Sequence, residues 1–413
     1  MLFHDVLLHA EATAARRLAT IDGDARRSYA EVAARVRRAA GGLRAMGLAA
    51  GDRVALIGLN SAAYLEAYFA LSLAGLVAVP INTRLSAGEV AFILDDCATS
   101  AVLADNALAG LAGGGRPVVP LDGDGWERFL AGSPPLDEPV AGTSEDSVAH
   151  IFYTGGTTGR PKGVMLSHRN VVSSATNKVV LGAFRRDDVW LHAVPMFHQA
   201  DAWAVVSFTG LGARHVFLPS FAPGPALDLI ERERGVGVQL VPTMIFMMLD
   251  QPGAATRDLA AIRRILYGSA PMPTAMLERA TDVFGDVFQH IYGLTECAGT
   301  VATTPWPPEP AERAGARMAS CGQQVTGVRL RIADDAGRVL PPGEIGRIQA
   351  RGANVMLGYW GRPEETEAAF VDGWLDTGDL GHMDDEGFVF IVDRAKDMII
   401  TGGENVYPAE VES

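Results

Sequence analysis

Short hydrophobic runs alternate with longer amphipathic stretches through the first third of the chain. Residues 53–59 (RVALIGL) predict a buried strand, residues 61–75 a helix, and residues 76–82 (LVAVPIN) the next strand. A strand, a helix and a second strand in this order are typical of parallel strands joined by a crossover helix. The pattern therefore predicts a βαβ unit in this part of the chain.

A further helix is predicted just before this unit. Ser28 and Glu31 have the spacing of a capping box, in which each side chain hydrogen-bonds the backbone N–H of the other residue. The Ala- and Arg-rich stretch that follows stops near Gly47. The sequence predicts a helix here, with Leu43 and Met46 on its inner face.

The alternation of strands and helices resumes between Asp188 and Tyr292 and predicts a second doubly wound region. Strands are expected at 189–197, 215–219, 238–242, 263–268 and 287–293, with helices between them. After about Gly315, short alternating strands separated by turn residues predict a small antiparallel sheet or barrel. Residues 110–145 are rich in Gly, Pro and Asp, carry little periodicity and predict a linker.

The predicted fold class is α/β, with two doubly wound sheet-and-helix subdomains plus a small antiparallel β-barrel-like subdomain. At 413 residues the chain exceeds the usual size of a single hydrophobic core. The expected subdomain bounds are about 1–150, 151–314 and 315–394. The first 394 residues would then form one large domain.

Composition narrows the classes of function. A formal charge of −14 argues against nucleic-acid partners, because binding to phosphate backbones needs clustered Lys and Arg. Cys97, Cys297 and Cys321 form no CxxC pair, so neither a disulfide framework nor a zinc site is indicated. The N-terminus lacks a basic signal-like region, and the longest charge-free apolar run, residues 67–81, is too short to cross a bilayer. A cytoplasmic protein without a membrane span is expected.

Residues 153–168 (YTGGTTGRPKGVMLSH) form the first stretch with recognisable chemistry. Backbone N–H groups of glycines, threonine hydroxyls and a lysine are suited to phosphate oxygens. The GxxxxGK[ST] spacing of a P-loop fails, because Pro161 has no N–H and Lys162 is followed by Gly163 instead of a hydroxyl. A phosphate loop of another kind is predicted, and a merely flexible surface loop is the simpler alternative.

The stretch YTGGTTGRPKGV resembles the phosphate-loop signature of the adenylate-forming superfamily. Members include acyl-CoA synthetases, aryl-acid CoA ligases, luciferases and the adenylation domains of peptide synthetases. Gly155 stands where the family usually has serine. Further stretches resemble family motifs in the family's order: MFH (196–198), YGSAP (267–271), YGLTE (292–296), GWLDTGD (373–379) and DRAKDMIITGGENVYPAEVE (393–412). The chain is identified as a member of this superfamily, in the branch of acyl-CoA synthetases and aryl-acid (feruloyl-type) CoA ligases.

The resemblance implies a reaction in two steps. A substrate carboxylate attacks the α-phosphate of ATP, which gives an acyl-adenylate and pyrophosphate, and the acyl group then passes to CoA. ATP and Mg²⁺ are the implied cofactors, and CoA is the implied co-substrate. The implied ATP-binding residues are Thr154, Gly155, Gly156, Thr157, Thr158, Gly159, Lys162, Gly268, Ser269, Ala270, Tyr292, Gly293, Thr295, Asp379 and Arg394.

In the first step two anions, the substrate carboxylate and the ATP phosphates, must come together. The roles of the residues in this set follow from the need to neutralise that charge. Lys162 and the loop threonines would hold the departing phosphates, while Thr295 contacts the α-phosphate and Glu296 ligates Mg²⁺. Without the other motifs, Thr295-Glu296 would be interpreted as a helix N-terminus. Asp379 would accept both ribose hydroxyls, with Arg394 at the same sugar or the phosphate. Their simpler alternatives are a turn residue and a solvated charge.

The acid-binding pocket is expected around one histidine and five other side chains. His198 stands where the family places an aromatic residue or a histidine between the acid site and the thiol tunnel, and it is counted with the catalytic residues. The remaining candidates are Trp203, Thr243, Met244, Tyr267 and Leu294. No Arg or Lys stands among them to pair with a second carboxylate, so a fatty or aryl-propenoic acid is expected.

The end of the chain resembles only the opening of the family's small C-terminal domain. Lys396 occupies the hinge position, and Gly402 and Gly403 would line the route of the CoA pantetheine. Residues 395–413 are therefore expected to be the hinge and the opening of a truncated domain. The family lysine that completes adenylation would lie beyond Ser413, so poor adenylation by this chain is expected.

Three hypotheses for function stay open at this point. The first is an ATP-dependent carboxylic acid:CoA ligase, the second an adenylation enzyme that loads a carrier protein, and the third a nucleotide-binding module without turnover. Lys162, Thr295, Glu296 and Asp379 argue against the third. The sequence leaves the specific acid and the oligomeric state open, a homodimer included.

Overall fold

The computed structural model of the chain describes residues 1–155, 160–270, 272–306, 317, 319–394, 399–401 and 404–406. The first half contains α1 (Phe3–Ala14), β1 (Leu18–Asp22), β2 (Ala25–Ser28), α2 (Tyr29–Ala45), β3 (Arg53–Ile57), α3 (Ala62–Leu73), β4 (Val77–Pro80), α4 (Ala87–Asp96), β5 (Ala101–Ala104), β6 (Val118–Pro120), α5 (Gly123–Gly132), β7 (Val148–Thr154), β8 (Lys162–Ser167) and α6 (His168–Leu181). A short 3-10 helix, η1 (Asn106–Ala112), follows β5.

The second half begins with alternating strands and helices: β9 (Val189–His192), α7 (Gln199–Leu211), β10 (Arg214–Phe217), α8 (Pro223–Glu233), β11 (Gly237–Leu240), α9 (Pro242–Leu249), β12 (Arg264–Gly268), α10 (Thr274–Phe284) and β13 (Phe288–Leu294). Two 3-10 helices are η2 (Ala254–Thr256) and η3 (Thr295–Cys297). The remaining elements are β14 (Gly299–Thr303), β15 (Gln323–Gln324), β16 (Val328–Ala333), β17 (Gly346–Gly352), β18 (Gly358–Tyr359), α11 (Pro363–Ala368), β19 (Phe370–Val371), β20 (Trp374–Met383), β21 (Val389–Arg394), β22 (Ile399–Thr401) and β23 (Glu404–Val406).

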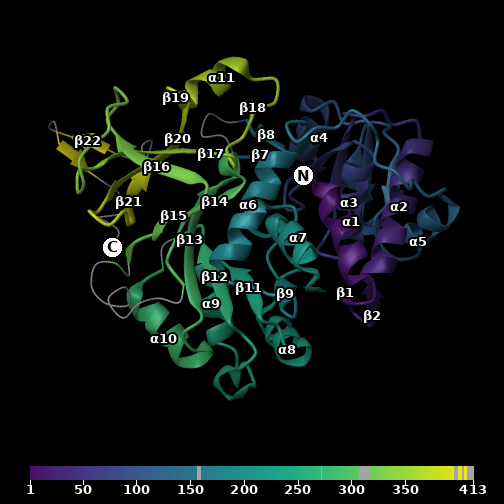
Figure 1. Ribbon diagram of the computed structural model, residues 1–413, viewed down its shortest axis with the longest axis horizontal. Helices are drawn as coiled ribbons and strands as arrows, with labels where there is room; N and C mark the ends of the chain where they lie inside the picture. The colour runs from purple at the N-terminus through teal and green to yellow at the C-terminus, as the bar shows by residue number, and fades with distance from the viewer. Residues whose placement is uncertain are drawn as a thin grey trace.

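Two mixed sheets and a smaller antiparallel sheet make up the fold (Figure 1). The seven-stranded sheet has the order β18-β8-β7-β4-β3-β5-β6, with β3 to β6 parallel and β8 antiparallel to β7. The predicted βαβ unit is its centre, formed by β3, α3 and β4. The α/β class is confirmed.

The nine-stranded sheet has the order β15-β14-β13-β12-β11-β9-β10-β1-β2. The five strands predicted between Asp188 and Tyr292 run parallel in its middle. Its edge strands come from elsewhere, because β1 pairs in parallel with β10 and brings β2 with it. Strands β1 and β2, from the start of the chain, thus belong to the same sheet as β9 to β15. This sheet includes residues from both sides of the expected subdomain bound near residue 150.

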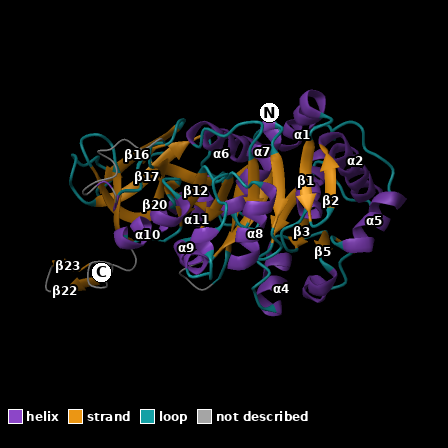
Figure 2. Ribbon diagram, turned by 90° about the horizontal axis from the view of Figure 1, so that it is seen from below, coloured by secondary structure: helices purple, strands orange, loops and turns teal. Residues whose placement is uncertain are grey.

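The third sheet is antiparallel and has five strands, in the order β16-β17-β20-β19 with β21 paired to β20. This confirms the small antiparallel sheet expected after Gly315. It lies at the opposite end of the molecule from β1, β2 and α5 (Figure 2). Strands β22 and β23 pair with each other.

A layer of helices separates the two mixed sheets. Helices α6 and α7 pack together, α1 packs on α7, and α1 also contacts α2 and α3 (Figure 1). Helix α3 is buried almost all round, because other elements cover every side of it. Its sequence accordingly has no polar face.

The apolar run at residues 67–81 divides between the end of α3 and β4. In the described part of the chain, no helix is long and apolar enough to cross a membrane. The run is apolar because both elements lie in the core.

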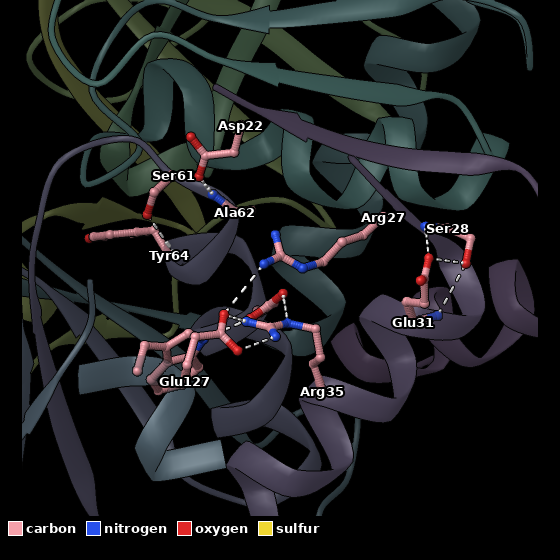
Figure 3. A network of polar contacts seen from close by, with 11 residues as sticks. Asp22, Arg27, Ser28, Glu31, Arg35, Ser61, Ala62, Tyr64 and Glu127 are labelled. Carbon is pink, nitrogen blue, oxygen red and sulfur yellow. Dashed lines mark hydrogen bonds and ion pairs between the residues drawn. The ribbon is translucent and has the colours of Figure 1, made fainter. Parts of the chain in front are cut away.

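The predicted capping box at the start of α2 is present. Ser28 N–H donates to Glu31 at 2.7 Å, and the Ser28 hydroxyl accepts from Glu31 N–H at 3.4 Å (Figure 3). Leu43 is fully buried, as predicted, but Met46 is 37% exposed. The prediction for Met46 was wrong because the helix ends at Ala45, so the helical periodicity no longer fixes the direction of the next side chain.

A polar network joins α2, α3 and α5 (Figure 3). The fully buried Glu66 carboxylate accepts from Arg35 Nε at 2.6 Å and from Trp126 Nε1 at 2.7 Å. Arg35 also makes two 2.8 Å hydrogen bonds to Glu127. Residues 110–145 were expected to be a linker, but they contain β6 and α5, which the buried Trp126 anchors.

Candidate active site

The glycine-rich loop joins two paired strands. β7 ends at Thr154 and β8 begins at Lys162, and these two residues are register partners at the base of the loop. Gly155 is exposed, as expected of a backbone that must approach a ligand. Gly156, Thr157, Thr158 and Gly159 lie outside the described residues.

Lys162 is held by an ion pair at the edge of the seven-stranded sheet. Its Nζ lies 2.5 Å from Glu365 Oε2 of α11 and 5.1 Å from the centre of the Tyr359 ring. The hydrogen bond from Lys162 lowers the pKa of the Glu365 carboxyl. Because both side chains are partly exposed, a phosphate oxygen can replace this carboxylate at small free-energy cost.

Glu296 lies in η3, directly after β13. One carboxylate oxygen, Oε1, accepts from the Tyr359 hydroxyl at 3.0 Å, and the Glu296 carbonyl accepts from Met356 N–H at 2.8 Å. The buried Asn354 amide donates to the Cys297 carbonyl at 2.9 Å. The segment before β18 therefore fixes the turn that carries Thr295 and Glu296.

Tyr359 joins these two parts of the site, and sequence reasoning missed it. Its ring faces Lys162 and its hydroxyl reaches Glu296. Burial raises the pKa of Tyr359, with the charge of Glu296 acting in the same direction, so the phenol stays a donor. No local pattern around the GYW stretch points to a partner 63 residues earlier.

Asp379, Tyr292 and Arg394 meet on the antiparallel sheet. The Tyr292 hydroxyl donates to Asp379 Oδ2 at 2.7 Å, and Arg394 Nε lies 3.4 Å from Asp379 Oδ1. The register of β20 and β21 places Asp379 opposite Arg394. Burial raises the pKa of Asp379, while the Tyr292 hydrogen bond and Arg394 oppose this shift.

Two of the expected ATP-binding glycines, Gly268 and Gly293, stand where β12 and β13 end. A Cβ on Gly268 would overlap the Ile291 carbonyl, and one on Gly293 would overlap the Gly299 carbonyl. Ser269 has φ +67°, a left-handed conformation that turns the chain away from the strand. Ser269 and Ala270 are both exposed.

The side chains expected around the acid differ in their surroundings. His198 is exposed, and its Nδ1 accepts from Ala200 N–H at 3.0 Å at the start of α7. Desolvation by the surrounding chain nevertheless lowers the pKa of His198. An exposed side chain with protein on most sides is typical of a cleft wall.

Trp203 and Tyr267 are instead buried. Trp203 Nε1 donates to Gln239 Oε1 at 2.9 Å, and its ring packs in a cluster of aromatic side chains. Tyr267 stacks on His290, with ring centres 4.8 Å apart. Thr243 is exposed, and Met244 and Leu294 are half-buried. Lys396, Gly402 and Gly403 lie outside the described residues.

The residues fit a magnesium–nucleotide complex. Within the described residues, no three His, Cys, Asp or Glu side chains form a metal cage. Mg²⁺ does not need such a cage, because it is commonly held by one or two carboxylates together with substrate phosphates and water. Glu296, close to the tyrosine that faces Lys162, is a donor of this kind.

Comparison with known proteins gives close relatives over most of the chain. The model of a family described as "AMP-binding enzyme" matches residues 7–360. The chain is 41% identical over 393 residues to a feruloyl-CoA synthase of an Amycolatopsis species, an alignment that covers 94% of this chain and 77% of the relative. It is 36% identical over 396 residues to a fatty acid–[acyl-carrier-protein] ligase of Streptomyces coeruleorubidus, covering 94% of this chain and 76% of the relative.

A solved structure supports the same assignment. The o-succinylbenzoate CoA synthetase of Bacillus subtilis, in complex with ATP and magnesium ion, superposes with a TM-score of 0.88 at 32% identity. The superposition covers 98% of this chain and 83% of that one. The family model, the long alignments and this structure agree with the geometry of the site. The chain belongs to the AMP-binding enzymes of the adenylate-forming superfamily, in the branch of AMP-forming acyl-CoA ligases.

Proposed function

We propose that the protein activates a fatty or aryl-propenoic acid with ATP and transfers the acyl group to CoA. The observation that carries the proposal is the meeting at Tyr359 of the glycine-rich loop and the YGLTE turn. Lys162 lies over the ring of this tyrosine, and Glu296 accepts a hydrogen bond from its hydroxyl. Such a pair can bind the departing phosphates and their metal together.

The roles of the residues follow from charge. Adenylation brings a carboxylate to a polyphosphate, so the protein must neutralise negative charge and hold both reactants in line. Mg²⁺, when bound at Glu296, would supply further positive charge at the phosphates. Lys162 would exchange Glu365 for a phosphate oxygen, and Thr295 would donate to the α-phosphate.

The nucleoside end would be held by the antiparallel sheet. Asp379 already accepts from Tyr292 at Oδ2 and lies beside Arg394 at Oδ1. A ribose would add its two hydroxyls as donors to this carboxylate. We further propose that residues 1–394 act as one large domain with three subdomains and that Lys396 lies at a hinge.

The class of acid is supported by two of the side chains expected around it and by the relatives. Met244 and Leu294 are apolar and half-buried, which suits a hydrocarbon or an aromatic ring. The feruloyl-CoA synthase at 41% identity favours an aryl-propenoic acid. Gly402 and Gly403 remain the proposed contacts of the CoA pantetheine.

A panel of acids tests this proposal. Full-length protein with ATP and Mg²⁺ would be incubated with fatty, benzoic and cinnamic acids, and pyrophosphate release and CoA thioester would be measured. Thioester with a cinnamic or fatty acid is expected. Absence of pyrophosphate release with every acid would instead support a nucleotide-binding module without turnover.

A carrier-protein ligase is the second candidate, and the relative that acts on an acyl-carrier protein favours it. In the same assay, CoA would be replaced by a phosphopantetheinylated carrier protein. Acyl transfer to the carrier at a higher kcat/KM than to CoA would decide for this candidate.

A further inference from the structure

Lys178 is a buried lysine that the proposed mechanism does not use. The chain has only three lysines, Lys162, Lys178 and Lys396, whereas its Lys and Arg together number 35. Lys178 lies in α6 and is 4% exposed. Its Nζ is 4.4 Å from the centre of the Trp203 ring, one of the residues expected around the acid.

The amine of Lys178 has unused hydrogen-bonding capacity. Over the described residues it makes neither a hydrogen bond nor an ion pair, and its contact is with the face of the Trp203 ring. Asp201 is the nearby acid, but its oxygens accept from Trp190 Nε1 at 2.9 Å and pair with His192 Nδ1 at 2.5 Å. Burial holds the pKa of Lys178 well below its usual range, and the charge of Asp201 only partly opposes this. An amine that contacts only an aromatic ring can still donate hydrogen bonds to an oxygen atom.

The amine borders a small cavity at the sheet. The cavity has a volume of about 10 Å³, enough for about one water-sized group, and its wall is mostly apolar. It is lined by Lys178, Leu181, Gly182, Leu266, Gln289, Ile291, Thr300 and Thr303. The cavity therefore lies between the end of α6 and the strands β12, β13 and β14.

This cavity lies close to Gly268, one of the expected ATP-binding residues. Ile291 is the register partner of Gly268, and Leu266 is two residues before Gly268, a distance of about 7 Å along the strand. A Cβ on Gly299 would come within 2.7 Å of Lys178 Nζ, so the glycine after η3 leaves room for the amine. Trp203 is one of the residues expected around the acid, so an acid that reaches its ring would come close to the Lys178 amine.

We propose that Lys178 binds an oxygen atom at the far end of the acid. The substrate would then carry a hydroxyl or carbonyl oxygen there instead of ending in plain hydrocarbon. The inference rests on the proposed function, because it takes the acyl group to lie beside Trp203. The rival explanation is that Lys178 only balances the charge of Asp201, which would affect stability and not the choice of acid.

The test compares two acids that differ by one oxygen atom. Wild type, Lys178→Met and Ser174→Ala would be assayed for pyrophosphate release with cinnamate and with 4-hydroxycinnamate. Methionine keeps a long, unbranched side chain beside Trp203 but has no amine. Ser174→Ala is the matched control, because it removes a polar group one turn away on α6, where the hydroxyl donates to the Ala298 carbonyl at 2.6 Å.

The readout is the ratio of kcat/KM for 4-hydroxycinnamate to that for cinnamate. The ratio is expected to exceed one in wild type, to fall about tenfold or more in Lys178→Met, and to stay at the wild-type value in Ser174→Ala. An unchanged ratio in a folded Lys178→Met overturns the inference and leaves the proposed function intact. If Lys178→Met does not fold, a wild-type ratio below one overturns the inference by itself. If neither acid nor any other supports pyrophosphate release, the proposed function fails and the inference fails with it.

Discussion

Tyr359 contacts both the lysine of the phosphate loop and the expected metal ligand. Its ring lies 5.1 Å from Lys162 Nζ, and its hydroxyl donates to Glu296 at 3.0 Å. It does not belong to either motif that it joins. At the scale of single residues, we therefore expect Tyr359 to position Glu296.

Replacing Tyr359 with Phe tests this role. The ring over Lys162 remains, but Glu296 loses a hydrogen bond to a charged group, worth about 1.5–3 kcal/mol. We expect kcat to fall about tenfold, and the Mg²⁺ concentration for half-maximal rate to rise. Pyrophosphate release over a magnesium titration would measure both.

The control for this variant is Trp360→Phe. Trp360 also donates one hydrogen bond, from Nε1 to the Asp96 carbonyl at 3.2 Å, away from Glu296. It should keep the magnesium dependence of wild type. A Tyr359→Phe enzyme with an unaltered magnesium profile would contradict the positioning role.

A second residue-scale prediction concerns His150, a fully enclosed histidine of β7. It packs against Phe3, Tyr68 and Phe152, and burial lowers its pKa to about 3. The folded state therefore binds fewer protons than the unfolded state below pH 6.5. The contribution of neutral His150 to the free energy of unfolding is expected to be complete above pH 6.5. It is expected to be lost as the pH falls toward 3.

In the variant His150→Phe, the free energy of unfolding should decrease less steeply as the pH falls. Each buried neutral histidine contributes a slope of up to about 1.4 kcal/mol per pH unit between the two pKa values. Urea unfolding at pH 7, 6 and 5 would measure the slope. His9→Gln, at an exposed position of α1, should retain the wild-type slope. Equal slopes in His150→Phe and wild type would be the contrary result.

At the scale of elements, the buried Glu66 carboxylate determines how α2, α3 and α5 pack. The variant Arg35→Met removes its cation and leaves a buried charge, which is expected to lower the free energy of unfolding by about 3–5 kcal/mol. Adding Glu66→Gln removes the charge and keeps an acceptor for Trp126, so the double variant should recover part of this loss. Denaturant titrations would measure both.

Arg27→Met is the matched control for this network. Arg27 reaches Glu127 at 3.4 Å near the surface, where ion pairs contribute about 0–1 kcal/mol. If Arg35→Met were no more destabilising than Arg27→Met, the network would not have the structural role described here.

Some elements could be predicted from their own residues and others could not. The capping box of α2 and the parallel strands of the nine-stranded sheet depend on local spacing, and both are confirmed. Helix α5 was missed because glycines and prolines surround it. Trp126 and Leu130 are the large side chains on its buried face, too few to give a clear helical pattern. The pairing of β1 with β10 was also missed, since no local pattern determines which distant strand lies beside another.

At the scale of the whole molecule, each sheet contributes one part of the site. The seven-stranded sheet carries Lys162, Glu296 follows strand β13 of the nine-stranded sheet, and the antiparallel sheet carries Asp379. A nucleotide bound to all three would hold the sheets together. Ligand binding should therefore stabilise the whole chain and not one subdomain.

Thermal unfolding with and without ATP tests this expectation. At a concentration of Mg²⁺–ATP about 100-fold above Kd, the free energy of unfolding should rise by about 2.7 kcal/mol. The melting temperature should increase in a single transition, and Lys162→Met should need more ATP for the same shift. An increase confined to one of several transitions would argue against a site shared by the three sheets.

The sequence by itself determined the βαβ unit, the strands between Asp188 and Tyr292, the α/β class and the motifs of the family, because these depend on residues within about one element of each other. The tertiary structure alone decided that Tyr359 meets Glu296 and that the Lys178 amine lies over the Trp203 ring beside a cavity. Both facts depend on contacts between residues far apart in the chain. Such contacts follow from how sheets and helices pack, which no local spacing of residue types encodes.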